Sequence, residues 1–236
     1  MKIKPLFIIF LIVTFTSYSQ EFKIGLKGGL NLPTTGNLLH LGTSSGGGNN
    51  VDPANDFLYK PDKDFSYHFG AFASIGYNNF FLRPEVNFTL LNASYPLTYK
   101  TSTWEMKRFD FPVLIGMNIS NNMSIYAGPI FSYINDFVID GTENPIIYKK
   151  NTIGAAAGVL VEMGRFGIDF RYEYGISKYE EQRVDYYRVY YGTNVAYLQE
   201  NNLSQFIISV HVNIFQTNSN GRNRGKRPSW SQSNCF

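Results

Sequence analysis

The chain has 236 residues, of which 20 are Phe and 17 are Tyr, and its charged fraction of 17% is low. Soluble domains usually reach about 25%. The formal net charge of +3 gives no indication of a nucleic-acid partner. Because the aromatic residues alternate with polar ones and form no apolar run of about 20 residues, the composition excludes a helical membrane protein. It also argues against a disordered chain, and the length fits one domain.

The first 19 residues have the pattern of a cleaved signal peptide. Two lysines precede an apolar run over residues 6–13, and Ser17 and Ser19 lie before Gln20. The run is too short to cross a bilayer comfortably as a helix, and no Cys follows it. We therefore expect residues 1–19 to direct export and the mature chain to begin at Gln20.

Beyond this segment, the main pattern is an alternation of apolar and polar residues with period 2, which is typical of strands with two different faces. It is clearest over residues 166–177, where an aromatic and aliphatic face lies opposite a face of glycines and charges of both signs. A transmembrane β-strand needs about 9–11 tilted residues, whereas strands of soluble sandwiches average about 5–6. Eight segments of the longer kind are present: 22–32, 65–77, 81–90, 104–118, 123–134, 152–163, 166–177 and 204–215.

Three prolines interrupt these segments, and proline cannot donate a hydrogen bond to a strand ladder. Pro84, Pro112 and Pro129 are therefore expected at bulges or local breaks.

Short and long connections alternate along the chain. Residues 78–79, 120–122 and 164–165 are short turns, whereas 33–64, 92–103, 135–151 and 179–203 are long. Short periplasmic turns and long extracellular loops are typical of outer-membrane barrels. A soluble up-and-down barrel shares the strand count, but its outside is polar. We predict an all-β fold over residues 20–215, an eight-stranded antiparallel up-and-down transmembrane β-barrel in the outer membrane of a Gram-negative cell.

Several motifs occur in an order and spacing that support this prediction. They are IGLKGGLN (24–31), LRPEVNF (82–88), KRFDFPVLIGMNI (107–119), IYAGPIFSY (125–133) and FGIDFRYEYGISKY (166–179). With them the chain resembles the small outer-membrane β-barrel family of Bacteroidota, often labelled porin-family or PorT-like. The resemblance implies a barrel similar to OmpA-type domains and no particular activity. The chain departs from the family in its long Gly/Asn-rich first loop and in a tail after the last strand.

The predicted inward faces carry charges in balance. The basic residues are Lys23, Lys27, Arg83, Arg108 and Arg171, and the acidic residues are Glu85, Asp110, Glu162, Asp169 and Glu173. Side chains just fill an eight-stranded barrel, and charges in so narrow a space must pair or be solvated. We predict a salt-bridged, plugged lumen in which these groups are structural. A narrow path for protons or small ions along them is the alternative.

The sequence gives little indication of catalysis or of cofactor binding. His68 and His211 face inward on two strands, and no GxSxG motif accompanies them. Both are interpreted as core histidines. Cys235 is the single cysteine, either a free thiol or an intermolecular disulfide partner, and the aspartates of the first loop do not fit an EF-hand. We expect a non-enzymatic protein without cofactor or resident metal.

Two regions carry residues that are typical of protein interfaces. The fourth loop contains Tyr186, Tyr187, Arg188, Tyr190 and Tyr191, which alternatively extend the barrel above the membrane. The tail, residues 216–236, is basic and expected to be disordered and periplasmic, and it contains Arg222, Arg224, Lys226, Arg227 and Trp230. The leading hypothesis is an accessory or interaction subunit of an envelope complex. The alternatives are a narrow channel or porin, or adhesion through the extracellular loops.

Overall fold

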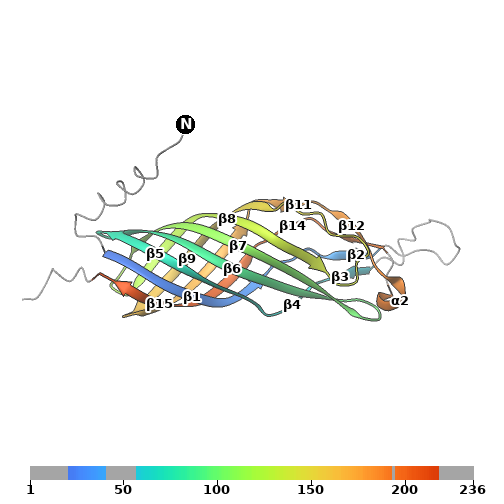
Figure 1. Ribbon diagram of the computed structural model, residues 1–236, viewed down its shortest axis with the longest axis horizontal. Coiled ribbons are helices and arrows are strands. Elements are labelled where there is room, and N and C mark those ends of the chain that lie inside the picture. The colour runs from blue at the N-terminus through green and yellow to red at the C-terminus, as the bar shows by residue number, and fades with distance from the viewer. Residues whose placement is uncertain (1–20, 41–56, 193–194, 218–236) are drawn as a thin grey trace, which may run out of the picture.

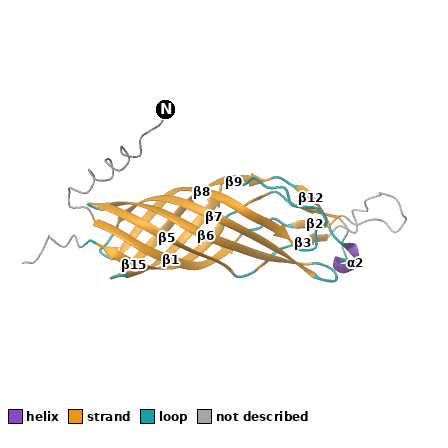
Figure 2. Ribbon diagram, viewed as in Figure 1, coloured by secondary structure: helices purple, strands orange, loops and turns teal. Residues whose placement is uncertain are grey.

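The protein is a long all-β barrel in a computed structural model that describes residues 21–40, 57–192 and 195–217 (Figure 1). Strands make up most of these ranges, which also contain the four-residue helix α2 (Arg188–Tyr191) (Figure 2). No helix among them has the length and apolarity needed to cross a bilayer. The long strands are β1 (Glu21–Pro33), β5 (Ser66–Tyr77), β6 (Phe80–Pro96), β7 (Thr101–Asn118), β8 (Met123–Ile139), β9 (Asn151–Met163), β10 (Phe166–Gly175) and β15 (Gln205–Gln216).

Antiparallel ladders join these eight strands into a closed ring. β1 pairs with β5 on one side and with β15 on the other, and the β6–β7 pairing closes the sheet. Each segment with the alternating pattern forms one of these strands, so the predicted eight-stranded antiparallel barrel is confirmed. Closure leaves no unpaired edge in the ring, as a bilayer requires of a spanning sheet.

The short turns lie at one end of the barrel and the longer connections at the other (Figure 1). At the end with the short turns, Asn78 and Gly164 adopt φ angles of 54° and 66°. These left-handed conformations let the chain reverse direction within two residues. The three predicted short turns are therefore confirmed, and so are three of the four predicted long connections.

The second long connection was predicted wrongly, because β6 and β7 run through most of residues 92–103. They leave a turn over residues 97–100. Asn92 and Ser94 are polar, but Leu91, Ala93 and Tyr95, which alternate with them, are buried. The period-2 alternation continues there, but the inward residues are now apolar and the outward residues are polar.

The prolines are accommodated by local lapses in pairing. Between β6 and β7 the register stops at Pro84, skips two residues and resumes unchanged at Asn87. A similar lapse follows Pro112 in the β7–β8 ladder. The actual register shifts lie elsewhere, at Ile24/Gly25 and Lys107/Arg108.

The outer face of the barrel carries an apolar belt. On β7 the outward residues from Phe109 to Met117 are all apolar, and Ile119 continues the series beyond the strand. Ten steps of about 3.3 Å at a tilt of about 40° give a height of about 25 Å, which matches the apolar band of outer-membrane barrels. The belt therefore fits the hydrocarbon layer of a bilayer.

Beyond this belt the strands exchange the polarity of their two faces. On β6 the inward series changes from Thr89 to Leu91, while the outward series changes from Leu90 to Asn92. β7 changes in the same way at Arg108 and Lys107, the residues that pair with Thr89 and Leu90. The same ladders thus have a membrane barrel's polarity within the belt and the polarity of a water-soluble barrel above it.

Further sheet structure closes the end of the barrel that lies away from the short turns. The first and fourth long connections contribute a four-stranded sheet in the order β12 (Gln182–Asp185), β13 (Val195–Leu198), β2 (Leu38–His40), β3 (Phe57–Tyr59). Shorter pairings join β11 (Lys178–Tyr179) to β14 (Asn201–Asn202), and β4 (Asp62–Lys63) to β6. We call this end the cap, consisting of residues 34–40, 57–65, 91–107, 135–150, 176–192 and 195–204.

Candidate functional site

The lumen of the belt contains charged side chains that pair with one another. Lys27 Nζ lies 3.0 Å from Glu85 Oε2 and 3.1 Å from Asp169 Oδ2. Arg171 Nη2 contacts the same two carboxylates at 3.0 and 2.9 Å. Arg83 Nε lies 2.9 Å from Glu85 Oε1, and all five side chains are at most 3% exposed. Each carboxylate of this group is therefore shared by at least two cations.

The network continues toward the cap through three further ion pairs. Arg171 Nη1 and Arg108 Nη2 each lie 3.5 Å from Glu173, and Arg108 Nε lies 3.0 Å from Asp110. The hydroxyl of Thr89 also donates to Asp110 at 2.6 Å. Four cations and four carboxylates are joined in this way, so the central network has no net formal charge.

The remaining two predicted charges form a separate group near the short turns. Lys23 Nζ lies 2.7 Å from Glu162 and 3.3 Å from Glu21. His211 Nε2 lies 3.6 Å from Glu162, and neither ring nitrogen of His211 has a hydrogen-bond partner among the described residues. His211 therefore differs from a fully satisfied core histidine.

A neutral hydrogen-bond chain, which the sequence did not reveal, runs beside the central network. Ser209 Oγ lies 3.0 Å from His68 Nε2, and His68 Nδ1 lies 2.6 Å from Asn31 Oδ1. Asn31 donates to Gln205, which in turn donates to Glu173. Because a carboxylate only accepts hydrogen bonds, Gln205 donates to Glu173 and Asn31 donates to Gln205. Asn31 Oδ1 then accepts from His68, so His68 carries a proton on Nδ1.

The Ser209–His68–Asn31 arrangement has the distances of a nucleophile, base and orienting group. The three side chains are buried, however, with 1%, 4% and 1% exposure. Ser209 is therefore screened from bulk solvent, and the three side chains hold one another in a fixed orientation. A signal was present in the polar residues at inward positions of β1 and β15, but their pairing depends on strands far apart in sequence.

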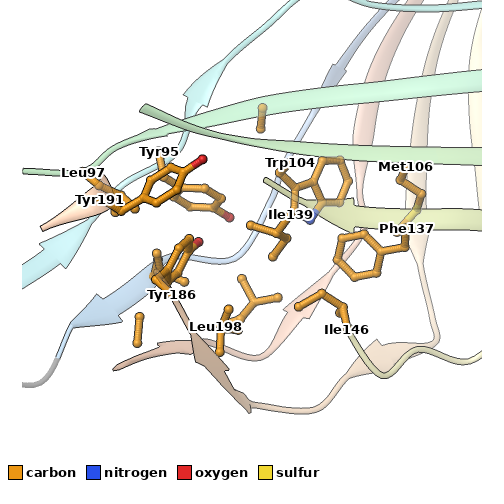
Figure 3. Close-up of a cluster of buried hydrophobic side chains, with 14 of the residues drawn as sticks. Tyr95, Leu97, Trp104, Met106, Phe137, Ile139, Ile146, Tyr186, Tyr191 and Leu198 are labelled. Carbon is orange, nitrogen blue, oxygen red and sulfur yellow. The ribbon is translucent and has the colours of Figure 1, made fainter. Parts of the chain in front are cut away.

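Inside the cap, the lumen is filled by an apolar core (Figure 3). The figure shows Tyr95, Trp104, Phe137, Ile139 and Leu198 directed toward a common centre. They come from β6, β7, β8 and β13, and the rings of Trp104 and Phe137 meet edge to face with centroids 5.3 Å apart. The cap end of the barrel therefore contains a packed apolar core.

The prediction of exposed partner-binding tyrosines was wrong for Tyr186 and Tyr191. Both belong to the cap core because the fourth connection folds back over the end of the barrel. Tyr187 and Tyr190 are exposed. The side chain of Arg188 lies outside the description, as do the signal segment and the tail residues Arg222, Arg224, Lys226, Arg227 and Trp230.

A polar clamp attaches α2 to the rest of the cap. The Tyr191 hydroxyl donates to Asp140 at 2.8 Å, and Lys100 Nζ donates to the same hydroxyl at 2.9 Å. The hydrogen bond from Tyr191, assisted by Lys100, lowers the pKa of Asp140 against the opposing effect of burial. Gly141 adopts a φ of 86° beneath Tyr191, and a Cβ there would lie 2.2 Å from the ring. The clamp thus needs glycine at this position.

Within the described ranges, no three His, Cys, Asp or Glu side chains are grouped as a metal site requires. Of the first-loop aspartates, Asp64 accepts a hydrogen bond from Ser94, and Asp52 and Asp56 lie outside the description.

Comparisons with known proteins agree with the closed ring, the apolar belt and the polar lumen. The family described as "Outer membrane protein beta-barrel domain" matches residues 18–181. The chain belongs to this family. No curated protein matches the sequence.

Two crystal structures of Ail, the attachment invasion locus protein of Yersinia pestis, are similar to this outer-membrane β-barrel protein. The one in complex with the heparin analogue sucrose octasulfate shares 10% identity at a TM-score of 0.36, covering 82% of this chain and 97% of Ail. The other shares 11% identity at a TM-score of 0.32, covering 81% and 97%. At this similarity no property of Ail is carried over.

Membership of the family places this outer-membrane β-barrel in a Gram-negative envelope. Its belt lies in the bilayer, its short turns face the periplasm and its cap faces outward, as in other barrels of this layout.

Proposed function

We propose that the protein is a closed, non-conducting barrel that acts through its surfaces as an interaction subunit of an envelope complex. The observation that carries this proposal is the filling of the lumen at two levels. The ion-pair network occupies the belt, and the apolar core occupies the cap. We also propose that, within the outer-membrane β-barrel family, the chain is a PorT-like member.

The central network opposes ion flow for an electrostatic reason. A passing ion would have to separate Lys27 or Arg171 from carboxylates about 3 Å away, in a space that excludes most water. Breaking such a buried pair costs about 3–5 kcal/mol, before the ion meets the apolar cap core. The pairs therefore serve to hold the barrel shut.

Planar-bilayer recording of the purified full chain tests closure. We expect no stable conductance steps from the wild-type protein, whereas a general porin in the same bilayer provides the positive control. Stable open steps would instead establish the narrow-channel alternative.

The proposal that the protein binds an envelope partner rests on the basic tail, and a separate experiment tests it. The tail is best removed after Thr217, because Thr217 still hydrogen-bonds to Phe22 at the end of the barrel. A pull-down from solubilised outer membrane should recover specific envelope proteins with the full chain and fewer with residues 218–236 deleted. If both forms are recovered alone, the accessory-subunit role fails.

Binding at the cell surface is a second candidate, favoured by the side chains at the tip of the cap. Tyr99, Tyr187, Val189 and Tyr190 are all exposed there, and the Lys100–Asp140–Tyr191 clamp holds the helix that carries two of them. Whole-cell adhesion should fall when Tyr99, Val189 and Tyr190 are replaced by Ser. Equal adhesion by this variant would exclude the tip as the binding surface.

A further inference from the structure

The outer surface of the cap has a groove where β9 and β10 leave the regular barrel wall. Residues 147–149 form one side and residues 178–182 form the other, and the groove encloses about 250 Å³. The β9–β10 ladder ends at the pair Gly154–Gly175. The groove lies beyond this end, where the two segments no longer pair as strands.

Hydrogen bonds at both ends hold the sides of the groove together. Near the belt, the carbonyl of Ile153 accepts hydrogen bonds from the N–H groups of Ile176 and Ser177 at 3.0 and 3.1 Å. At the far end, the Gln182 side chain accepts from the N–H of Ile147 at 3.0 Å and donates to its carbonyl at 3.3 Å. A groove fixed at both ends is preformed, so a ligand does not have to order it.

Aromatic rings provide apolar surface in the groove. Tyr148 and Tyr179 both line it and flank Phe137, with ring centroids 5.7 and 6.3 Å from that of Phe137. The Tyr179 hydroxyl is buried and has no hydrogen-bond partner among the described residues. Such rings combine an apolar face with a polar edge.

The charged groups of the groove balance one another. Lys149 and Lys178 line it together with Glu180 and Glu181. Lys149 Nζ lies 3.6 Å from Glu180, and Lys178 Nζ lies 2.5 Å from Glu200; all four side chains are mostly exposed. An anion in the groove would meet two carboxylates, and a cation would meet two ammonium groups. A neutral ligand with many hydroxyls can instead accept from the lysines and donate to the glutamates.

The groove lies directly above the lipid-facing wall. Ile153, Tyr174 and Ile176 are exposed, apolar or aromatic, and mark the outer margin of the belt beside the groove. A ligand here can place acyl chains along the wall and a polar headgroup between Tyr148 and Lys178. We propose that the groove binds the saccharide headgroup of a glycolipid in the outer leaflet.

The test uses the full chain in nanodiscs that contain phospholipid with a rough lipopolysaccharide, and native mass spectrometry counts the glycolipid retained. We expect about one retained glycolipid on the wild-type protein and at least about tenfold weaker retention for Tyr148→Ala. Tyr190→Ala, which removes an exposed tyrosine at the tip, is the matched control and should retain the glycolipid. Heat-modifiable mobility on unboiled gels shows that each variant is folded.

A charge variant separates sugar recognition from phosphate recognition. With a neutral saccharide, Glu180→Gln/Glu181→Gln should weaken retention or leave it unchanged, and dephosphorylated glycolipid should be retained as well. Stronger retention by this variant, or loss on dephosphorylation, would assign the groove to phosphate and overturn the proposal. So would equal retention by Tyr148→Ala, or binding of the free oligosaccharide without any glycolipid retained.

Discussion

Neutralising one carboxylate in the belt is the sharpest test of the ion-pair network. The Glu85 carboxylate forms ion pairs with Lys27, Arg83 and Arg171, each with a nitrogen–oxygen distance of at most 3.0 Å. Its side chain is completely buried. Glu85→Gln keeps the size of the side chain and removes its charge. Lys27 and Arg171 then retain Asp169, but Arg83 loses the one carboxylate that it contacts among the described residues.

The expected loss follows from leaving a buried cation unpaired. Removing one partner of a buried ion pair costs about 3–5 kcal/mol, and we take about 4 kcal/mol for Glu85→Gln. With a urea m-value of about 2–3 kcal/mol/M, the unfolding midpoint should fall by about 1.3–2 M. Unfolding is followed by Trp104 fluorescence in detergent micelles and by gel mobility.

Two further variants make the result decisive. Removing the orphaned cation as well, in Glu85→Gln/Arg83→Met, restores equal numbers of positive and negative charges and should recover more than half of the loss. Glu180→Gln breaks an exposed pair and should leave the midpoint unchanged. If Glu85→Gln behaves like Glu180→Gln, or if the double variant shows no recovery, the lumen is solvated and the ion-pair reasoning fails.

Four predictions concern the cap. Tyr191→Phe should destabilise α2 by about 1 kcal/mol and raise its hydrogen exchange, whereas Tyr190→Phe on the exposed side should not. Because Asp140 has a lowered pKa in the folded protein, its contribution is present above the unfolded pKa and is lost as pH falls through the folded one. Exchange of α2, corrected for intrinsic rates, should therefore rise below about pH 4, and a pH-independent profile would contradict this. Gly141→Ala forces a Cβ against Tyr191 and should expose α2 to trypsin at a lower protease concentration than wild type. Trp104→Ala should cost about 3–5 kcal/mol in urea unfolding followed by gel mobility, because this variant lacks the Trp104 fluorescence. A loss below about 1 kcal/mol would mean that the cap core is loosely packed.

The sequence predicted the barrel well because a membrane strand has one unbroken rule, apolar outside and polar inside. Residues such as Phe170 and Arg171 obey it, so strand number, turn positions and inward charges could all be read. The rule fails from Leu91 onward, where the inward face of β6 becomes apolar and its outward face becomes polar. The prediction of a loop over residues 92–103 was wrong for this reason. Local alternation does not indicate which solvent faces a strand.

The cap and the neutral chain depend on contacts that no local pattern specifies. Leu38 and Leu198 meet because β2 pairs with β13 across more than half of the sequence. Tyr186 and Tyr191 were interpreted as surface residues of a loop, but both are buried in the cap core, where their ring centroids lie 5.7 Å apart. The His68–Asn31 bond likewise requires the β1–β5 register, which the sequence alone left open.

The exchange of polarity between the two faces of the strands at Leu90 and Lys107 also fixes the depth at which the barrel sits in the bilayer. Sinking it deeper would draw Lys107 into hydrocarbon, which costs up to about 2–4 kcal/mol at the midplane, and raising it would wet the aromatic side chains near the short turns. From Lys107 to Thr101 the strands rise about 15 Å above the edge of the hydrocarbon layer. Whatever binds at the tip therefore meets a rigid platform held at a constant height above the cell, whose elevation is encoded in the strands themselves.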